Sequence, residues 1–147
     1  MSQAPTSTLP SPAPLTAEQI QVLLDRSPFI AFSGMRCVRA DPATETVEIH
    51  CPMRPEFERG VGTRQWHGGP IAAVIDTAGD FALVMAIGKP LPTINFRVDY
   101  LRPAIGTPLI AVARVRRQGK SVGVVDVDIL NDKGVLLAIG RASYATA

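Results

Sequence analysis

Residues 66–78 read WHGGPIAAVIDTA and bring a histidine, two glycines and one acid close together. The acid, Asp76, lies nine residues after His67 and interrupts an almost entirely apolar stretch. Because burying a charge is costly unless it is paired, an acid in such a stretch often has a chemical task. The glycines expose backbone N–H groups at an expected helix N-terminus, where a developing negative charge is stabilised. An acid and an oxyanion site are the minimum for hydrolysing an activated acyl group.

Composition sets the frame for this segment. A chain of 147 residues is long enough for one domain with a real core. Its apolar fraction of 46% and charged fraction of 19% are those of an ordinary globular protein. A net charge of +2 is too small to argue for a nucleic acid or membrane partner, and 5% aromatic residues argue against base-stacking platforms.

The N-terminal segment and the apolar stretch carry the predictions about location. Residues 1–14 are rich in proline, serine and threonine, which predicts a disordered tail, and the domain is expected to span residues 15–147. The first basic residue is Arg26, so the basic segment that opens a secretory signal is missing and no such signal is expected. Asp76 and Asp80 fall inside the apolar stretch, which favours a buried core helix over a membrane span. We therefore expect a cytoplasmic location.

The cysteines and histidines give no metal-binding pattern. Cys37 and Cys51 match neither a CxxC pair nor a zinc spacing. They are expected on neighbouring strands, as small apolar residues. His67 has no partner histidine nearby, because His50 lies on a predicted strand. Neither a metal nor a cofactor is expected.

The order of predicted elements indicates an α+β protein. Thr16 can cap the first helix, which ends at Ser27-Pro28, and Gly88 is a stop signal for the second helix. The expected elements are a helix at 17–25, strands near 35–39 and 46–53, a surface loop at 54–66, a helix at 70–87, and strands at 93–101, 109–116, 122–130 and 135–144.

The second helix and the strand after it decide how these elements pack. The helix at 70–87 is apolar nearly all round, so other elements should wrap it. The strand at 93–101 alternates, with Thr93, Asn95, Arg97 and Asp99 on one side and apolar residues on the other. A long buried helix followed by a meander of strands predicts an antiparallel sheet curled around that helix.

This order resembles the hotdog fold, and the chain looks like the phenylacetyl-CoA-type (PaaI-type) branch of hotdog acyl-CoA thioesterases. The residues that carry the resemblance are HGG at 67–69 with Asp76, TINFRVDYLRPA at 93–104, the Gly119-Lys120 turn and Gly134. The resemblance covers roughly residues 30–145. It implies an enzyme that hydrolyses the thioester of a small or aryl acyl-CoA.

The resemblance also implies roles for particular residues. Asp76 would activate water or attack the thioester carbon directly, and the Gly68 N–H would polarise the thioester carbonyl. Thr93 would position the water or the carboxylate. In proteins of this kind the two half-sites come from different subunits, so a homodimer with shared active sites is expected. A further pairing into a dimer of dimers is open.

Other residues receive secondary roles. His67 is predicted to belong to the catalytic group, with loop geometry as its alternative role. Gly69 and Gln65 are predicted to contact the substrate. Lys120 and Arg117, at a basic hairpin, are predicted to bind the phosphates of coenzyme A.

The chain departs from the family at one position. Relatives often carry an asparagine about six residues before the histidine, where this chain has Val61. Gln65 or Arg64 could take its place. Two other functions therefore stand beside the thioesterase: a non-catalytic acyl-CoA-binding hotdog protein, and a hotdog dehydratase or hydratase.

Overall fold

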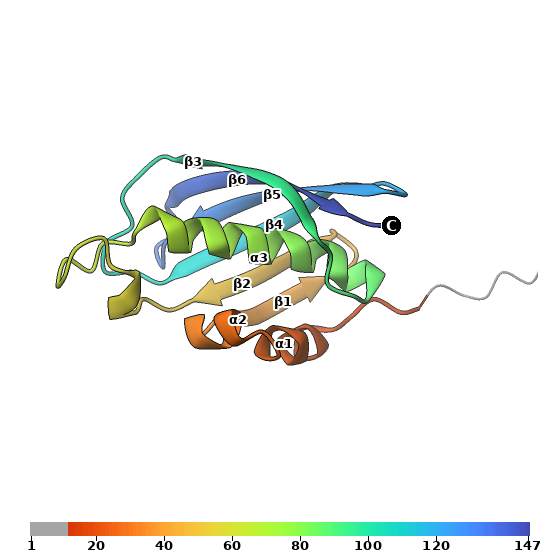
Figure 1. The fold of residues 1–147 in the computed structure, drawn as a ribbon, viewed down its shortest axis with the longest axis horizontal. Helices are drawn as coiled ribbons and strands as arrows, with labels where there is room; N and C mark the ends of the chain where they lie inside the picture. Colours follow the sequence, from red (N-terminus) through yellow and green to blue (C-terminus); the bar gives the residue numbers. More distant parts are fainter. Residues whose placement is uncertain (1–11) are drawn as a thin grey trace, which may run out of the picture.

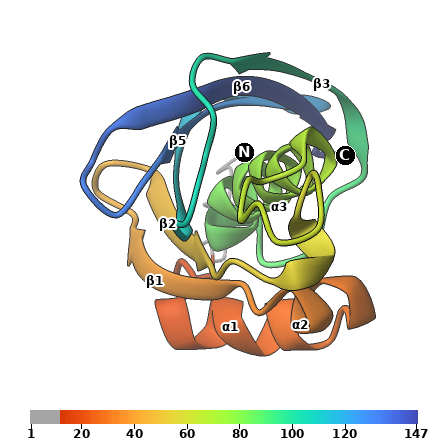
Figure 2. The ribbon, with the colours of Figure 1, turned by 90° about the vertical axis from the view of Figure 1, so that its left-hand side faces the viewer.

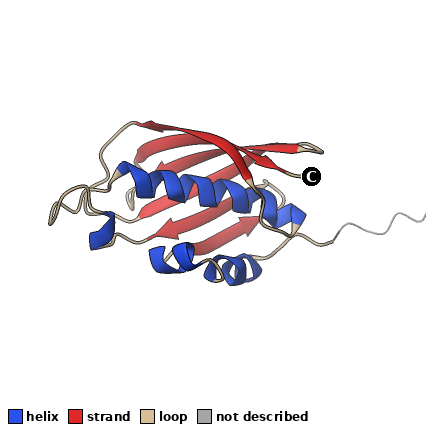
Figure 3. Cartoon of the chain, viewed as in Figure 1, coloured by secondary structure: helices blue, strands red, loops and turns tan. Residues whose placement is uncertain are grey.

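One long helix, α3 (Gly68–Ile87), lies in the concave face of a curved antiparallel sheet (Figures 1 and 2). This computed structural model describes residues 12–147, and six strands are found there in the order β1-β2-β4-β5-β6-β3. The strands are β1 (Arg36–Asp41), β2 (Thr46–Cys51), β3 (Thr93–Tyr100), β4 (Leu109–Gln118), β5 (Val122–Leu130) and β6 (Leu136–Ala145). The arrangement confirms the predicted α+β hotdog fold (Figure 3).

Helix α3 forms the centre of the hydrophobic core. His67 caps its N-terminus, and Gly88 ends it in the left-handed conformation with φ 84°. The helix begins two residues earlier than predicted because the histidine side chain, rather than Pro70, marks its start. It is long and apolar enough to cross a membrane by length and composition, yet 61% of its most apolar window is buried inside the protein. This burial agrees with the prediction of a core helix.

Two helices precede the sheet. Helix α1 (Ala17–Asp25) has the predicted bounds, and Thr16 and Gln19 form a reciprocal capping box at its start. Helix α2 (Pro28–Ser33) was not predicted, because Ser27-Pro28 was interpreted only as a helix end. Ser27 instead caps a new helix whose first position is a proline, where the missing N–H costs nothing.

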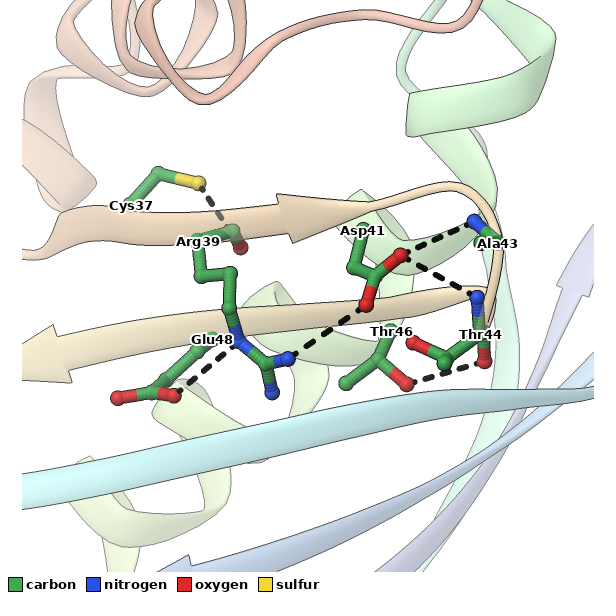
Figure 4. Close-up of polar contacts among 7 residues, drawn as sticks. All are labelled: Cys37, Arg39, Asp41, Ala43, Thr44, Thr46 and Glu48. Atoms are coloured by element: carbon green, nitrogen blue, oxygen red, sulfur yellow. Dashed lines mark hydrogen bonds and ion pairs between the residues drawn. The ribbon is translucent and has the colours of Figure 1, made fainter.

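The β1–β2 hairpin closes through a side-chain turn (Figure 4). The Asp41 carboxylate accepts hydrogen bonds from the backbone N–H groups of Ala43 at 3.0 Å and Thr44 at 3.3 Å. Asp41 thereby satisfies two backbone donors in the tight turn. Cys37 lies on β1 and Cys51 on β2, and both are free, as predicted for small apolar residues on neighbouring strands.

Strand β3 carries a bulge that changes which residues face the helix. Its pairing with β6 shifts register between Thr93 and Asn95, so one residue on β3 is left unpaired there. Thr93 therefore turns toward α3 together with Tyr100, and both side chains contact that helix. The predicted side for Thr93, shared with Asn95, was wrong because a strict two-residue alternation does not survive a bulge.

The remaining segments differ little from prediction. The segment 54–66 is a loop that contains a short 3₁₀ helix (Pro55–Phe57) and two isolated bridges to neighbouring backbone. Of the predicted tail, residues 1–11 lie outside the described residues, and residues 12–14 have no regular structure. The described chain begins to pack where the Leu15 N–H donates to the Met85 carbonyl, at 2.7 Å.

Gly140 on β6 lets α3 approach the sheet, and this contact can be tested. A Cβ added at Gly140 would collide with the Cγ2 atom of Ile75 on α3 and lie 3.3 Å from the Arg97 carbonyl. We expect Gly140→Ala to lower the free energy of unfolding by about 1–3 kcal/mol, because the core is already filled. Urea unfolding measures it. Gly60→Ala is the control, because it lies in a loop where the nearest atom is Cγ2 of the exposed Thr63 side chain, at 3.3 Å. Equal effects would contradict the packing argument.

Candidate active site

Asp76 is held from the sheet by the predicted threonine. It lies at the middle of α3, is partly buried, and its Oδ1 accepts a hydrogen bond of 2.8 Å from the Thr93 hydroxyl. The bulge on β3 turns this hydroxyl inward. A carboxylate that is held through one oxygen keeps its second oxygen available to accept a proton or to attack a carbon atom.

A second contact, which sequence reasoning missed, holds the backbone of the same residue. Tyr144 on β6 pairs directly with Thr93, and its hydroxyl donates to the Asp76 carbonyl at 2.7 Å. Tyr144 is fully buried, which raises the pKa of its phenol and keeps it protonated. Its ring fits only because Gly79 has no side chain there. Strands β3 and β6 thus hold both the carboxylate and the main-chain carbonyl of Asp76.

The start of α3 presents one unused backbone donor. The Gly69 N–H bonds to Nδ1 of the capping His67 at 3.0 Å. The Gly68 N–H, one position earlier, has no acceptor among residues 12–147. The Tyr100 hydroxyl donates to the Gly68 carbonyl at 2.6 Å and fixes the neighbouring Gly68–Gly69 peptide. Gly68 can therefore donate to an oxyanion, whereas Gly69 already has a partner.

A basic pocket of about 390 Å³ lies at this end of the helix. Its lining includes Gly68, His67, Gln65 and two cations, Arg59 and Arg102. Both arginines are exposed, and Arg102 also donates to the Leu136 carbonyl at 2.9 Å. The predicted contacts Gln65 and Gly68 thus share a pocket, and the two arginines are additional residues that the sequence pattern did not reveal.

A second pocket, of about 240 Å³, opens beside Asp76 and has the opposite character. Its lining residues come from α2 and its cap and from α3. In Figure 2 the helix α2 lies below α3. Asp76 and Asp80 are the charged residues in its lining, and no cation lines it in the described chain. The other lining residues are Ser27, Phe29, Ile30, Ala73, Thr77 and Phe81.

Asp80 is the second acid of this pocket, and its carboxyl is largely buried. One of its carboxylate oxygens accepts the Leu91 N–H at 3.1 Å, which fastens the connection between α3 and β3. Burial raises the pKa of Asp80 to about 7, and the nearby charge of Asp76 adds to that rise. The sequence signal for Asp80 was its place one turn after Asp76 on the same helix face.

The acid and the oxyanion donor of one chain are too far apart to act on one carbon. Gly68 and Asp76 are separated by eight positions on a continuous helix. That separation is roughly 12 Å at 1.5 Å of rise per residue. Both groups must lie within about 3 Å of the reacting atoms. The two groups of one chain therefore cannot both act on the same carbon.

Several positions that the sequence analysis singled out line neither pocket, and Gly69, a predicted substrate contact, is among them. Arg117 lies one residue before the end of β4, and Lys120 lies in the β4–β5 turn. The segment 100–104, which lines the basic pocket, precedes the other end of β4 (Figure 1). Val61 is fully exposed at a loop tip and lines neither pocket. Within the described part of the chain no three His, Cys, Asp or Glu side chains gather as metal ligands.

Comparisons with known proteins agree with the fold. Residues 65–138 match the family described as the thioesterase superfamily. An esterase-named protein of Halobacterium salinarum is 33% identical, over 87% of this chain and 90% of its own. Acyl-coenzyme A thioesterase PaaI of Escherichia coli is 36% identical, over 54% of this chain and 57% of its own. A solved thioesterase-superfamily structure is 32% identical with a TM-score of 0.83, covering 88% of this chain and 96% of that one.

The raised pKa of Asp80 predicts a pH-dependent stability. Asp80 holds its proton to about pH 7 in the folded chain, whereas the ordinary carboxyl loses it near 3.8. Its stabilising contribution is therefore complete below about pH 4 and lost as the pH rises to about 7. We expect Asp80→Asn to gain about 2–4 kcal/mol relative to wild type between pH 4 and 8.

Urea unfolding of both proteins across this range measures the difference. Asp128→Asn, at an exposed position on β5, is the control and should follow wild type. Parallel curves for wild type and Asp80→Asn would contradict the prediction.

Proposed function

The chain belongs to the thioesterase superfamily, and on that premise we propose that it hydrolyses the thioester of an acyl-CoA, with Asp76 as the acid that acts on the reacting carbon. The observation that carries the proposal is the pair of hydrogen bonds that Thr93 and Tyr144 donate to Asp76. They fix its carboxylate and its carbonyl in the lining of a pocket. The PaaI enzyme to which the chain is similar is named as an acyl-CoA thioesterase.

Hydrolysis requires that the C–S bond breaks and that a water oxygen replaces the sulfur. Asp76 either removes a proton from the attacking water or attacks the thioester carbon itself, forming an anhydride that water then cleaves. In both routes the carbonyl oxygen becomes negative, and the Gly68 N–H stabilises it. One such donor is worth roughly 3 kcal/mol. The departing thiolate takes up the proton released from water.

The two half-sites are proposed to meet in a homodimer. Strand β3 forms one edge of the sheet, and it exposes Ile94, Phe96 and Tyr100 by 41–53%. A long apolar edge strand that stays unpaired is prone to aggregation. Pairing with the same edge of a second copy would cover it. Gly68 of the partner subunit could then face Asp76, which the roughly 12 Å within one helix does not permit.

The charges of the two pockets suggest how the substrate lies. Coenzyme A carries phosphates, which favour the basic pocket with Arg59 and Arg102 and are repelled from a pocket with two acids. The acyl group would then enter the pocket beside Asp76, where Phe29 and Phe81 suit a small or aryl group. Lys120 and Arg117 could reach the phosphates only from another subunit.

Replacement of the acid tests the activity. We expect Asp76→Asn to lower kcat by roughly 10²–10⁴-fold, since an amide can neither accept the proton nor attack. Thiol release from acyl-CoA measures the rate, and size-exclusion chromatography checks that the assembly is unchanged. Asp128→Asn should retain wild-type turnover. Retained turnover in Asp76→Asn would remove Asp76 from the mechanism.

Mixed dimers test the shared site. Gly68→Pro removes the proposed donor but suits the first helical position, because His67 is extended with φ −71° and ψ 146°. Gly68→Pro and Asp76→Asn should each be inactive alone. Refolded together in equal amounts, they should recover about a quarter of wild-type activity, because half the dimers would hold one intact site.

Gly68→Ala is the matched control for the proline. It adds the same Cβ, which would lie 3.1 Å from the Tyr100 hydroxyl, but keeps the N–H. Gly68→Ala should therefore retain far more activity than Gly68→Pro. No recovery in the mixture, with heterodimers demonstrated, would contradict a site shared between subunits.

A further inference from the structure

We infer that Asp80 is a positioning residue for the reaction: its carboxyl holds the connection between α3 and β3 in the place from which the Thr93 hydroxyl reaches Asp76. The inference rests on the proposed thioesterase function, because it concerns the direction of the acid that acts on the reacting carbon. It depends on a closed ring of contacts, on the exposure of Thr93 and on the cost of an acid at position 80.

Asp80 and Asp76 belong to one closed ring of contacts. They lie one helical turn apart on α3. The Asp80 Oδ1 accepts the Leu91 N–H at 3.1 Å, and only Pro92 separates Leu91 from Thr93 in the chain. The Thr93 hydroxyl then returns to Oδ1 of Asp76 at 2.8 Å. Because so few bonds join these groups, a movement of Leu91 away from α3 also moves the Thr93 hydroxyl.

Thr93 depends on its backbone for its position. It is exposed in the single chain, and the connection that precedes it, residues 88–92, contains no helix or strand. On the sheet side, the Pro92 carbonyl accepts the Ala145 N–H at 2.9 Å. Hydrogen bonds between strands run in the plane of the sheet, so they do not fix how closely this corner approaches the helix. Among residues 12–147, Asp80 is the one side chain of α3 that accepts a hydrogen bond from the connection.

An acid at position 80 is costly, which argues against a purely structural role. The groups that face it are the Asp76 carboxylate on α3 and the protonated phenol of Tyr144 on β6, while α2 contributes no charge. The exposed Lys89 of the connection forms no ion pair among residues 12–147. Burial and the charge of Asp76 raise the pKa of Asp80 to about 7. An asparagine would accept the same N–H without this cost.

The strength of the hold follows the ionisation of Asp80. An ionised carboxylate accepts an N–H about twice as strongly as a neutral group does. Asp80 ionises as the pH rises through about 7, so the Leu91 N–H is then held more tightly. The Thr93 hydroxyl is correspondingly better placed to direct Asp76. We therefore expect kcat of the wild type to rise roughly threefold between about pH 6 and 8.

Substitutions at position 80 test the hold. Asp80→Asn keeps a neutral acceptor for Leu91, so its kcat should equal the low-pH value of wild type and show no step near pH 7. Asp80→Leu has no acceptor and should lower kcat roughly tenfold at about pH 8, with KM unchanged. Asp41→Asn is the matched control and should follow wild type, because Asp41 also accepts backbone N–H groups in a turn but lies in the β1–β2 hairpin.

Turnover is measured by the loss of thioester absorbance, which can be followed at every pH of the series. Butanoyl-CoA, octanoyl-CoA and benzoyl-CoA are compared first, and the one that wild type cleaves fastest is used throughout. Urea unfolding supplies a readout that a merely structural role would move in the other direction. Asp80→Asn should be more stable than wild type above about pH 7 and yet slower, since relief of the buried charge weakens the hold on Leu91.

Thr93→Val shows whether Asp80 acts through Thr93. Valine keeps the shape of the side chain but has no hydroxyl, so kcat should fall and the step near pH 7 should vanish. Asp80→Leu added to Thr93→Val should then lower kcat by less than about twofold further, because the link that it breaks is already cut.

The outcomes separate the inference from the proposed function. If wild type cleaves none of the three acyl-CoAs, the proposed function falls and the inference falls with it. If Asp80→Leu keeps the wild-type kcat, or changes KM alone, the inference is overturned and the proposed function stands. A step near pH 7 that survives in Thr93→Val would also overturn it, because the charge would then act on Asp76 directly. So would equal losses from Asp80→Leu with and without the Thr93 hydroxyl.

Discussion

Close contact between α3 and the concave face of the sheet is the constraint on which the rest of this structure depends. The helix can be apolar nearly all round because strands surround it, and glycines at 79 and 140 allow Tyr144 and Ile75 to fit. The same contact brings two strands against Asp76, so its carboxylate and its carbonyl are both held. Packing that stabilises the fold therefore also sets the direction of the acid.

The sequence predicted most of this architecture because its signals are local. Apolar periodicity, turn residues and caps place α1, α3 and the strands within a few residues of their bounds. Helix α2 was not predicted, because a proline such as Pro28 can either end or begin a helix. The β3 bulge was not predicted, because it does not interrupt the alternation of polar and apolar residues in the sequence. A cytoplasmic location and a domain spanning 15–147 stay predictions.

Some residues of the candidate site could likewise be predicted from the sequence, and others could not. Asp76 and Gly68 could be found from the HGG motif and the family resemblance, and Thr93 does contact Asp76. The contribution of Tyr144 could not be found, because it depends on a strand 68 positions away in the sequence. Arg59 and Arg102 meet at one pocket only after the chain folds. Residues brought together by tertiary structure alone carry no spacing that sequence inspection can recognise.

The cap at His67 gives the HGG motif a meaning apart from glycine flexibility. A histidine ring accepts a hydrogen bond at Nδ1 only when it is neutral, so the bond from Gly69 exists in that form alone. The ring thereby occupies the Gly69 amide and leaves the adjacent Gly68 amide without an acceptor among residues 12–147.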